Sequence, residues 1–104
     1  MKSRTVDAFV YLLRCADGSL YCGWTTDLAR RLGAHRRGTG SRYTTRRLPV
    51  EIAAAWRAPD RSAAMRLEAS IKRLPRPEKV ALIAGAPLAG GERVDQKAVA
   101  SANG

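Results

Sequence analysis

The sequence predicts an α+β fold, with a small three-stranded antiparallel sheet flanked by helices in the order β-β-α-β-α-α. Two runs rich in β-forming residues, 9–15 and 20–25, flank Asp17-Gly18, which is a strong hairpin signal. Apolar residues alternate through 50–56 as in a half-buried strand, and they recur at helical spacing through 60–74. These patterns place a hairpin first, then a helix, a third strand and two further helices.

The hairpin turn allows two registers, and the register decides which way the tyrosines on its two strands point. If the loop is Asp17-Gly18 alone, Tyr11 and Tyr21 point to opposite faces of the sheet. If the loop is Ala16-Asp17-Gly18, with Gly18 in the left-handed conformation, both tyrosines share a face as diagonal neighbours. Both registers fit the sequence.

We expect the first helix within residues 25–38, with Thr25 or Thr26 as its N-cap, Asp27 in its first turn and Gly38 as its stop. The segment that follows, GTGSRYTTRRLP, has the composition of a loop. The alternating pattern after it predicts a strand with four apolar side chains on one side, namely Val50, Ile52, Ala54 and Trp56.

The second helix should begin at a capping Asp60, with its apolar residues on a single stripe. That stripe consists of Ala64, Leu67, Ile71 and Leu74. A short third helix follows Pro75 and closes a domain that spans residues 1–85. We expect residues 86–104, which are rich in Ala and Gly with scattered charge, to form a disordered tail.

The composition describes one small, strongly basic domain, with 104 residues and a formal net charge of +10. Such a charge makes nucleic acid the expected partner, because neutralising phosphates releases condensed counterions. No membrane is expected, since no apolar run reaches the roughly 20 residues that span a bilayer. We expect no signal peptide, and the two cysteines, Cys15 and Cys22, suit a reducing cytoplasm.

Seven arginines and no acidic residue lie between Leu28 and Val50. One interpretation is a flexible connection whose charge keeps the protein in solution. We favour the other, in which the segment binds phosphates and Tyr43 stacks on a base, because uncompensated arginines repel one another without a polyanion. The residues expected to contact nucleic acid are Arg30, Arg36, Arg37, Arg42, Tyr43, Thr44, Arg46, Arg47 and Lys72.

The two tyrosines, with three further side chains, suggest a site for phosphodiester hydrolysis. Arg31 and His35 are four residues apart and lie on one face of the first helix, while Glu68 lies near the edge of the apolar stripe of the second. Each has a structural alternative; Glu68, for example, could simply pair with Lys72. Together, however, an arginine can neutralise charge on a phosphorane, a carboxylate can hold a divalent cation, and tyrosine or histidine can take a proton from water.

The order of these residues resembles the GIY-YIG endonuclease family, and in particular its small standalone bacterial members. Tyr11 occupies the first motif, written FVY here, and Tyr21-Cys22-Gly23 occupies the second. Arg31 and His35 match the family's Arg-x-x-x-His, and Glu68, within RLEASIK, matches its metal-binding glutamate. The resemblance spans residues 8–84. It departs from the family in the first glycine, replaced here by Phe9, and in an asparagine that has no counterpart after the glutamate.

The resemblance implies a metal-dependent endonuclease that hydrolyses phosphodiester bonds in DNA, acts on particular DNA structures and is linked to repair or recombination. Glu68 would bind one Mg²⁺ or Mn²⁺ ion, Arg31 would stabilise the pentacovalent phosphate, and His35 would assist proton transfer or orient a tyrosine. Tyr11 or Tyr21 would be the general base. We expect a cytoplasmic monomer that lies at the nucleoid when it is bound to DNA, with a partner protein to target it.

Two other functions compete with this one. The chain could be a module that keeps the fold and binds nucleic acid without turnover, or a small basic protein associated with RNA or the ribosome. Cleavage that needs a metal and Glu68 would distinguish a nuclease from the binding module. A preference for RNA that survives competitor DNA would favour the third interpretation.

Overall fold

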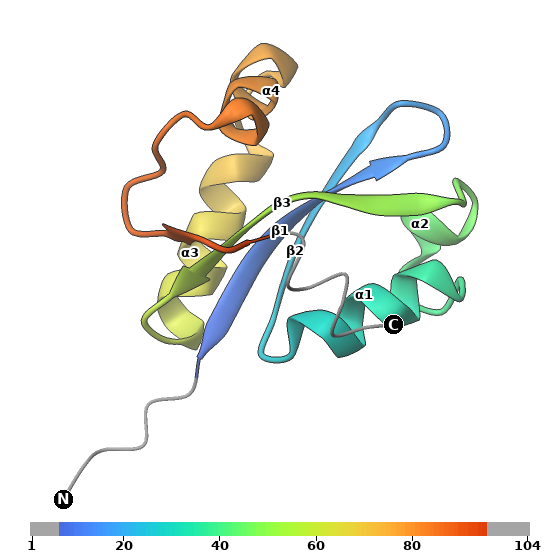
Figure 1. Ribbon diagram of the computed structural model, residues 1–104, viewed down its shortest axis with the longest axis horizontal. Helices are drawn as coiled ribbons and strands as arrows, with labels where there is room; N and C mark the ends of the chain where they lie inside the picture. The colour runs from blue at the N-terminus through green and yellow to red at the C-terminus, as the bar shows by residue number, and fades with distance from the viewer. Residues whose placement is uncertain (1–6, 96–104) are drawn as a thin grey trace, which may run out of the picture.

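Four antiparallel strands form one sheet at the centre of the structure, a computed structural model that describes residues 7–95. The strands are β1 (Ala8–Cys15), β2 (Leu20–Thr25), β3 (Val50–Ala58) and β4 (Glu92–Arg93), in the order β2-β1-β3-β4 (Figure 1). The predicted α+β class is confirmed, with one strand more than the three expected. The additional strand is β4, which pairs with β3 at the edge opposite β2.

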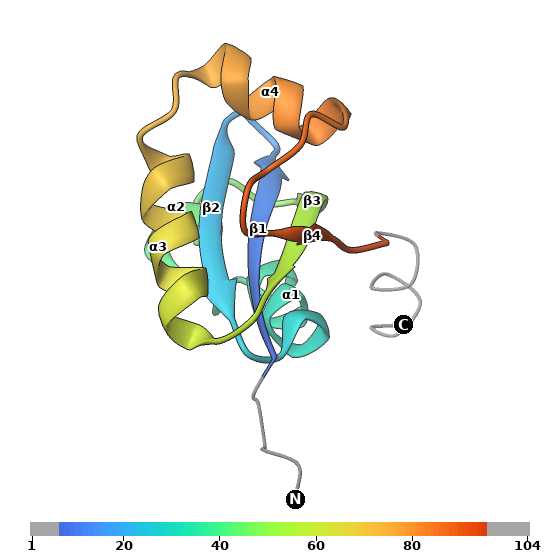
Figure 2. The same ribbon diagram turned by 90° about the vertical axis from the view of Figure 1, so that its left-hand side faces the viewer.

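Helices cover both faces of this sheet. The helices α1 (Leu28–Arg36) and α2 (Arg42–Thr45) lie on one face, and α3 (Arg61–Lys72) and α4 (Arg76–Ala84) lie on the other (Figures 1 and 2). Each face has its own apolar core, one that contains Tyr11 and Leu32 and one that contains Trp56 and Ile71. The edge strand β2 runs alongside α3 (Figure 2). No helix within residues 7–95 is both long and apolar enough to cross a bilayer.

The β1–β2 hairpin has the three-residue turn, and this places both tyrosines on the face of α1. Tyr11 is opposite Gly23, and Leu13 is opposite Tyr21. The amide of Cys15 donates to the carbonyl of Ser19 at 2.9 Å, and Gly18 has a φ of 85°. Only glycine adopts that left-handed conformation without strain, which explains why this residue closes the turn.

The helix starts are partly as predicted. Asp60 caps α3, and its carboxylate accepts from the amide of Ala63 at 2.8 Å. The first helix is capped by Asp27 and by neither threonine, since Asp27 accepts from the amide of Arg30 at 3.1 Å. The predicted loop before β3 contains the short helix α2, which forms because Ser41 accepts from the amide of Thr44 at 3.1 Å.

The strand β3 does not keep its apolar side chains on one side, so that prediction is wrong. Leu12 of β1 is opposite Ala54, but Leu13 is opposite Ile52, which means that β3 contains a bulge at this point. A bulge adds one residue and reverses the alternation beyond it. Trp56 therefore packs in the core under α3, and Val50 packs in the core under α1. An unbroken apolar alternation in the sequence conceals such an insertion.

The expected disordered tail is wrong for residues 86–95. Leu88 packs against the core under α3, and β4 continues the sheet. The guanidinium of Arg93 donates to the carbonyls of Leu82 and Ile83 at 2.9 and 3.0 Å, so it satisfies acceptors at the end of α4. The domain therefore extends beyond the expected boundary at residue 85. Residues 96–104 of the predicted tail lie outside the described part of the chain.

Candidate active site

A hydrogen-bonded pair, Tyr11 and His35, lies at the centre of the site. The phenolic oxygen of Tyr11 is 2.8 Å from Nε2 of His35, and the two side chains come from β1 and α1. Both are buried, with 2% of Tyr11 and none of His35 exposed. On the other side of the imidazole, Nδ1 lies 2.8 Å from the hydroxyl oxygen of Thr44 in α2. The pair is therefore held between three elements.

Two glycines make room for this pair. A side chain at Gly23, opposite Tyr11 on β2, would place its Cβ 2.5 Å from the phenolic oxygen. A Cβ at Gly40, in the segment between α1 and α2, would overlap the imidazole of His35. The sequence indicates no role in the site for either glycine, except that Gly23 belongs to the second motif. Their need to be glycine is steric and appears only once the strands and the loop are packed.

Arg31 lies beside the pair and contributes a positive charge. Its Nη2 donates to the carbonyl of Gly40 at 2.8 Å, which ties α1 to the following segment. Burial raises the pKa of Tyr11 to about 12, although a hydrogen bond from Arg31 opposes the rise. Burial, and then the charge of Arg31, lowers the pKa of His35 to about 4. Both groups are therefore uncharged at neutral pH.

Tyr21 is more accessible than Tyr11 and lies in a group of aromatic rings. Its ring centroid is 5.2 Å from that of His35 and 6.5 Å from that of Tyr11. It also stacks on Tyr43, at 5.8 Å with an interplanar angle of 29°. The shared face that the three-residue turn allowed therefore brings the two tyrosines and His35 together, and Tyr43 extends the group outward.

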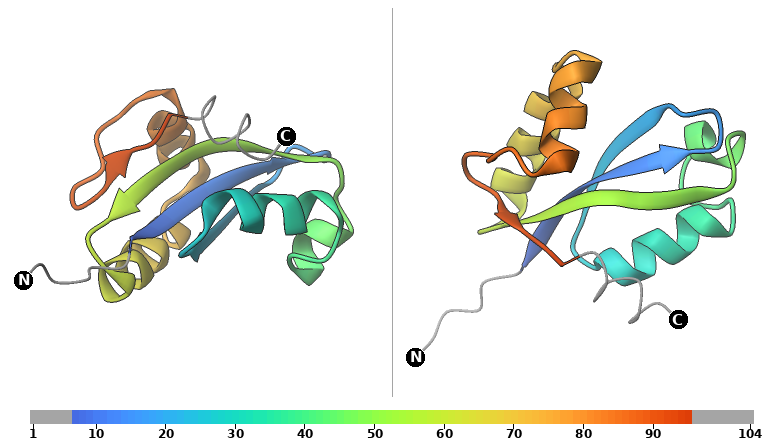
Figure 3. Two further views of the ribbon diagram at one scale, coloured as in Figure 1. Left: turned by 60° about the horizontal axis from the view of Figure 1, so that its bottom comes forward. Right: turned by 45° about the horizontal axis from the view of Figure 1, so that its top comes forward.

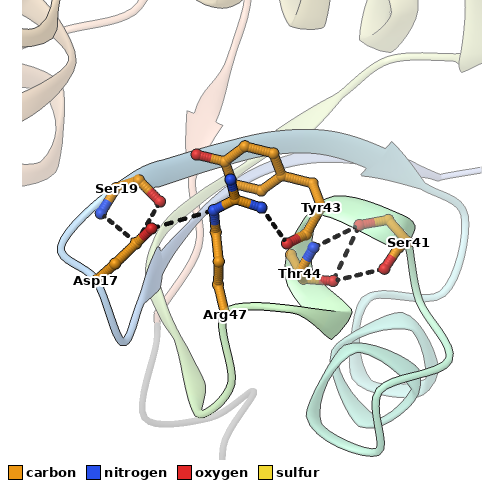
Figure 4. Close-up of polar contacts among 6 residues, drawn as sticks. All are labelled: Asp17, Ser19, Ser41, Tyr43, Thr44 and Arg47. Carbon is orange, nitrogen blue, oxygen red and sulfur yellow. Dashed lines mark hydrogen bonds and ion pairs between the residues drawn. The ribbon is translucent and has the colours of Figure 1, made fainter.

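A clamp formed by Asp17, Tyr43 and Arg47 fixes the outer part of the site (Figure 4). The guanidinium of Arg47 lies 3.7 Å from the centroid of the Tyr43 ring, and it donates to the Tyr43 carbonyl at 2.9 Å and to Asp17 at 3.1 Å. Asp17 lies in the hairpin turn, whose tip is next to α2 (Figure 3). Arg47 and Tyr43, both expected at nucleic acid, are thus engaged with each other and with the hairpin.

Glu68 lies on a different helix from Arg31 and His35. It lies on α3, which covers the opposite face of the sheet from α1. Its carboxylate is 3.4 Å from the ammonium of Lys72, as the structural alternative predicted, and its side chain is 20% exposed. The backbone carbonyl of Glu68 accepts from the thiol of Cys22 in β2, at 4.0 Å. Glu68 therefore lies next to β2, the edge strand that carries Tyr21.

A metal ion at Glu68 would have one protein carboxylate. Within residues 7–95, no three His, Cys, Asp or Glu side chains converge on a common point. Burial, and then the charge of Glu68, raises the pKa of the Cys22 thiol to about 12, so the thiol is protonated at neutral pH. Mg²⁺ is commonly held by one or two carboxylates together with water and substrate phosphates. Glu68 fits that kind of site and does not fit a site built by the protein alone.

The predicted nucleic-acid contacts divide into exposed arginines and buried or paired groups. A shallow hollow of about 530 Å³ lies beside α2, lined by Gly38, Thr39, Ser41, Arg42, Thr45 and Arg46. Thr44 is completely buried, so its predicted contact with nucleic acid is wrong; its hydroxyl faces His35. The arginines expected to contact nucleic acid and found with exposed side chains are Arg30, Arg36, Arg37, Arg42 and Arg46.

Comparisons with known proteins identify the family of this chain. The profile of the GIY-YIG catalytic domain matches residues 7–81. The UPF0213 protein XAC3202 of Xanthomonas axonopodis pv. citri is 50% identical over 78 residues, which cover 75% of this chain and 76% of the relative. A UPF0213 protein of Nitratidesulfovibrio vulgaris is 51% identical over 76 residues, or 73% of this chain and 69% of the relative.

A solved structure is similar as well. The solution NMR structure of the UPF0213 protein BH0048 from Bacillus halodurans is 42% identical to this chain, with a TM-score of 0.50. The match covers 75% of this chain and 83% of that one. The profile match includes both tyrosine motifs, both helices that carry the remaining site residues, and the strand between them. The chain therefore belongs to the GIY-YIG family, which is a family of nucleases.

Proposed function

We propose that this protein is a divalent-metal-dependent endonuclease that hydrolyses phosphodiester bonds in DNA. The observation that carries the proposal is the 2.8 Å contact between Tyr11 and Nε2 of His35, beside Arg31 and on the same face as Tyr21. A phenol that is hydrogen-bonded to an imidazole can transfer its proton to that imidazole. A neighbouring guanidinium can stabilise negative charge as it develops on phosphate. A role in DNA repair or recombination belongs to the same proposal.

The buried pair and the accessible tyrosine have different parts in this reaction. His35 has no exposed surface and acts through Tyr11, whose proton it can accept. With a pKa of about 12, Tyr11 keeps its proton at neutral pH until a further positive charge is near. Tyr21 is only partly buried, so it is the tyrosine that can meet the attacking water or the substrate directly. Arg31 extends from α1 to the carbonyl of Gly40, and from there its charge acts on both the phenol and the phosphate.

Glu68 is the residue proposed to hold the metal. When bound, Mg²⁺ or Mn²⁺ supplies Lewis-acid stabilisation of charge on the phosphate and the leaving oxygen. Because Glu68 and the tyrosines lie on opposite faces of the sheet, the scissile phosphate would lie along the edge of β2, within reach of both. Lys72 would then exchange its ion pair with Glu68 for contact with the substrate.

The remaining basic residues are proposed to bind the DNA backbone. Within residues 7–95, the side chains of Arg30, Arg37, Arg42 and Arg46 make no ion pair or hydrogen bond. Unpaired guanidinium groups repel each other because all are positively charged, and a bound polyanion relieves this repulsion. Arg42 and Arg46 share the hollow beside α2, close to the clamp that holds Tyr43.

Glu68→Gln tests the proposal, with Glu51→Gln as its matched control because Glu51 is an exposed carboxylate on β3. Nicked, flapped, branched and single-stranded DNA, and an RNA, are incubated with the protein and Mg²⁺ or Mn²⁺. We expect cleavage of at least one DNA by the wild type and by Glu51→Gln, and a loss of at least about a hundredfold in Glu68→Gln. Binding measured in EDTA should be similar in all three proteins.

A binding module without turnover is the second candidate function. It is favoured by one observation: Glu68 is paired with Lys72 and lies on the opposite face of the sheet from the Tyr11–His35 pair. If the wild type leaves every substrate uncut but binds DNA in a salt-dependent manner, this second function is correct and the nuclease proposal is wrong. Stronger binding to RNA in the presence of competitor DNA would assign the module to RNA.

A further inference from the structure

Three buried side chains form a line of hydrogen bonds across the site. The phenolic oxygen of Tyr11 lies 2.8 Å from Nε2 of His35, and Nδ1 of the same ring lies 2.8 Å from the hydroxyl oxygen of Thr44. Tyr11 is 2% exposed, and His35 and Thr44 are not exposed at all. A hydrogen bond that is shielded from water has a fixed partner, so the donor and acceptor of each contact can be assigned.

The direction of the line follows from the groups at its Tyr11 end. The guanidinium of Arg31 is close enough to lower the pKa of Tyr11, and as a group with donors only it offers no acceptor to the phenolic hydrogen. Among the described residues, the acceptor available to the phenolic hydrogen is Nε2 of His35. A neutral imidazole carries one N–H donor and one acceptor nitrogen. If Nε2 accepts from Tyr11, the ring proton is on Nδ1 and is donated to the hydroxyl oxygen of Thr44.

At the other end of this line of hydrogen bonds, the hydroxyl of Thr44 needs an acceptor for its own hydrogen, and Ser41 provides one. The hydroxyl of Thr44 lies 2.9 Å from the hydroxyl oxygen of Ser41 and 3.4 Å from the Ser41 carbonyl, and either can accept its hydrogen. Ser41 is the N-cap of α2, and its side chain also accepts from the amide of Thr44 (Figure 4). The cap therefore fixes the backbone and the side chain of Thr44 at once.

We infer that Thr44 is a positioning residue, which holds His35 in the tautomer protonated at Nδ1 and so keeps Nε2 free to accept the proton of Tyr11. In the proton transfer, the O–H bond of Tyr11 breaks and an N–H bond forms at Nε2. The product is a phenolate next to Arg31 and an imidazolium that still donates through Nδ1 to Thr44. This catalytic consequence rests on the proposed function, whereas the assignment of the tautomer does not.

The tautomer is directly measurable because His35 is the only histidine in the chain. Long-range ¹H–¹⁵N correlation spectra of the ¹⁵N-labelled protein at pH 7 distinguish a protonated from an unprotonated ring nitrogen. We expect protonation at Nδ1 in the wild type and in Thr44→Ser, which keeps the hydroxyl. Thr44→Val, which replaces the hydroxyl with a methyl group of similar size, should shift the ring toward protonation at Nε2.

A wild-type ring protonated at Nε2 would overturn the inference, and this result needs no variant. An unchanged tautomer in a folded Thr44→Val would overturn it as well; dispersion of the amide spectrum reports whether the variant is folded. Thr26→Val, at an exposed threonine outside the site, controls for the loss of a hydroxyl.

Nuclease activity gives a second, separate measurement. We expect kcat to fall about tenfold to a hundredfold in Thr44→Val with little change in KM, and to be largely kept in Thr44→Ser, because residues that orient a reacting histidine have effects of this size. Equal activity of Thr44→Val and the wild type would contradict the catalytic role of Thr44. If the wild type cuts no substrate, the proposed function fails while the tautomer measurement still decides the role of Thr44.

Discussion

Close contacts at single residues determine the chemical state of the site. Tyr11 and His35 come together because Gly23 and Gly40 have no side chains. A Cβ at either position would occupy the space of the phenol or the imidazole. The resulting burial moves both pKa values away from neutrality in opposite senses, upward for the phenol and downward for the imidazole. Two uncharged groups in contact can share a proton without placing a lasting charge in the core.

The pH dependence of stability should report the burial of His35. The pKa of His35 is lowered from 6.5 to about 4, so the unfolded chain takes up a proton below pH 6.5 that the folded chain does not accept until about pH 4. The free energy of unfolding should therefore decrease as the pH falls through this range, by up to about 3 kcal/mol at roughly 1.4 kcal/mol per pKa unit.

Urea unfolding of the wild type and of His35→Phe at several pH values measures this effect. The variant keeps the carboxylates, so the difference between the two curves isolates the histidine. Two parallel curves between pH 4 and 6.5 would show that His35 titrates alike in the folded and unfolded chains.

At the scale of elements, short segments connect the parts of the site. The three-residue turn sets the register of β1 and β2, and Asp17 in that turn binds Arg47 after α2. The one-turn helix α2 brings Thr44 to the imidazole and Tyr43 to Tyr21. The ion pair is exposed and contributes little to stability, so its main effect is to fix the position of the Tyr43 ring.

A comparison of two truncations should show that residues 86–95 belong to the domain. A chain that ends after Gly85 lacks β4, the packing of Leu88 and the hydrogen bonds from Arg93 to the end of α4. We expect it to be less stable than a chain that ends after Asp95 by about 2 kcal/mol, the order of one partly buried leucine and two hydrogen bonds. Thermal or urea unfolding gives the difference, and equal stabilities would mean that this segment does not contribute to the fold.

At the scale of the whole molecule, the charge is distributed around the site. Among residues 7–95, arginines whose side chains make no ion pair or hydrogen bond lie along α1 and α2, namely Arg30, Arg37, Arg42 and Arg46, and also on α3 and α4, as Arg61 and Arg76 do. Arg57, at the other edge of the sheet, is paired with Glu92 at 2.7 Å. A DNA backbone bound at the α1 and α2 side would meet the four unpaired arginines of that side, two of which line the hollow beside α2. The edge strand β2 is between this side and Glu68, so a substrate in contact with both must pass over that edge.

The salt dependence of DNA binding should reflect this distribution. Removal of one phosphate contact lowers the magnitude of the slope of log K against log salt by about 0.9 on duplex DNA. The double variant Arg42→Gln/Arg46→Gln should therefore lower it by up to about two. Arg57→Gln removes one charge from the ion-paired edge and should leave the slope within about 0.3 of the wild type. Fluorescence anisotropy with a labelled duplex between 50 and 200 mM salt is the measurement, and equal slopes for the double variant and the wild type would place the DNA elsewhere.

The sequence by itself determined the features that depend on neighbours along the chain. The hairpin, the cap at Asp60, the stripe of α3 and the spacing of Arg31 and His35 are local patterns, because strand alternation and helical periodicity repeat within a few residues. The resemblance to the GIY-YIG family follows from the same ordered motifs, and the profile match confirms it. Local patterns also led to two wrong predictions. The N-cap of α1 is Asp27 and not a threonine, and a bulge in β3 divides its apolar side chains between the two faces of the sheet.

Only the tertiary structure decided which of these residues meet. Tyr11 and His35 are 24 positions apart, and their contact depends on a turn register that the sequence left open and on a glycine, Gly40, whose role is purely steric. The burial of Thr44 and the position of Glu68 on the opposite face likewise depend on how the helices pack against the sheet. Contacts between distant segments are fixed by the shape of the whole core, and the pattern of any one segment does not contain that shape.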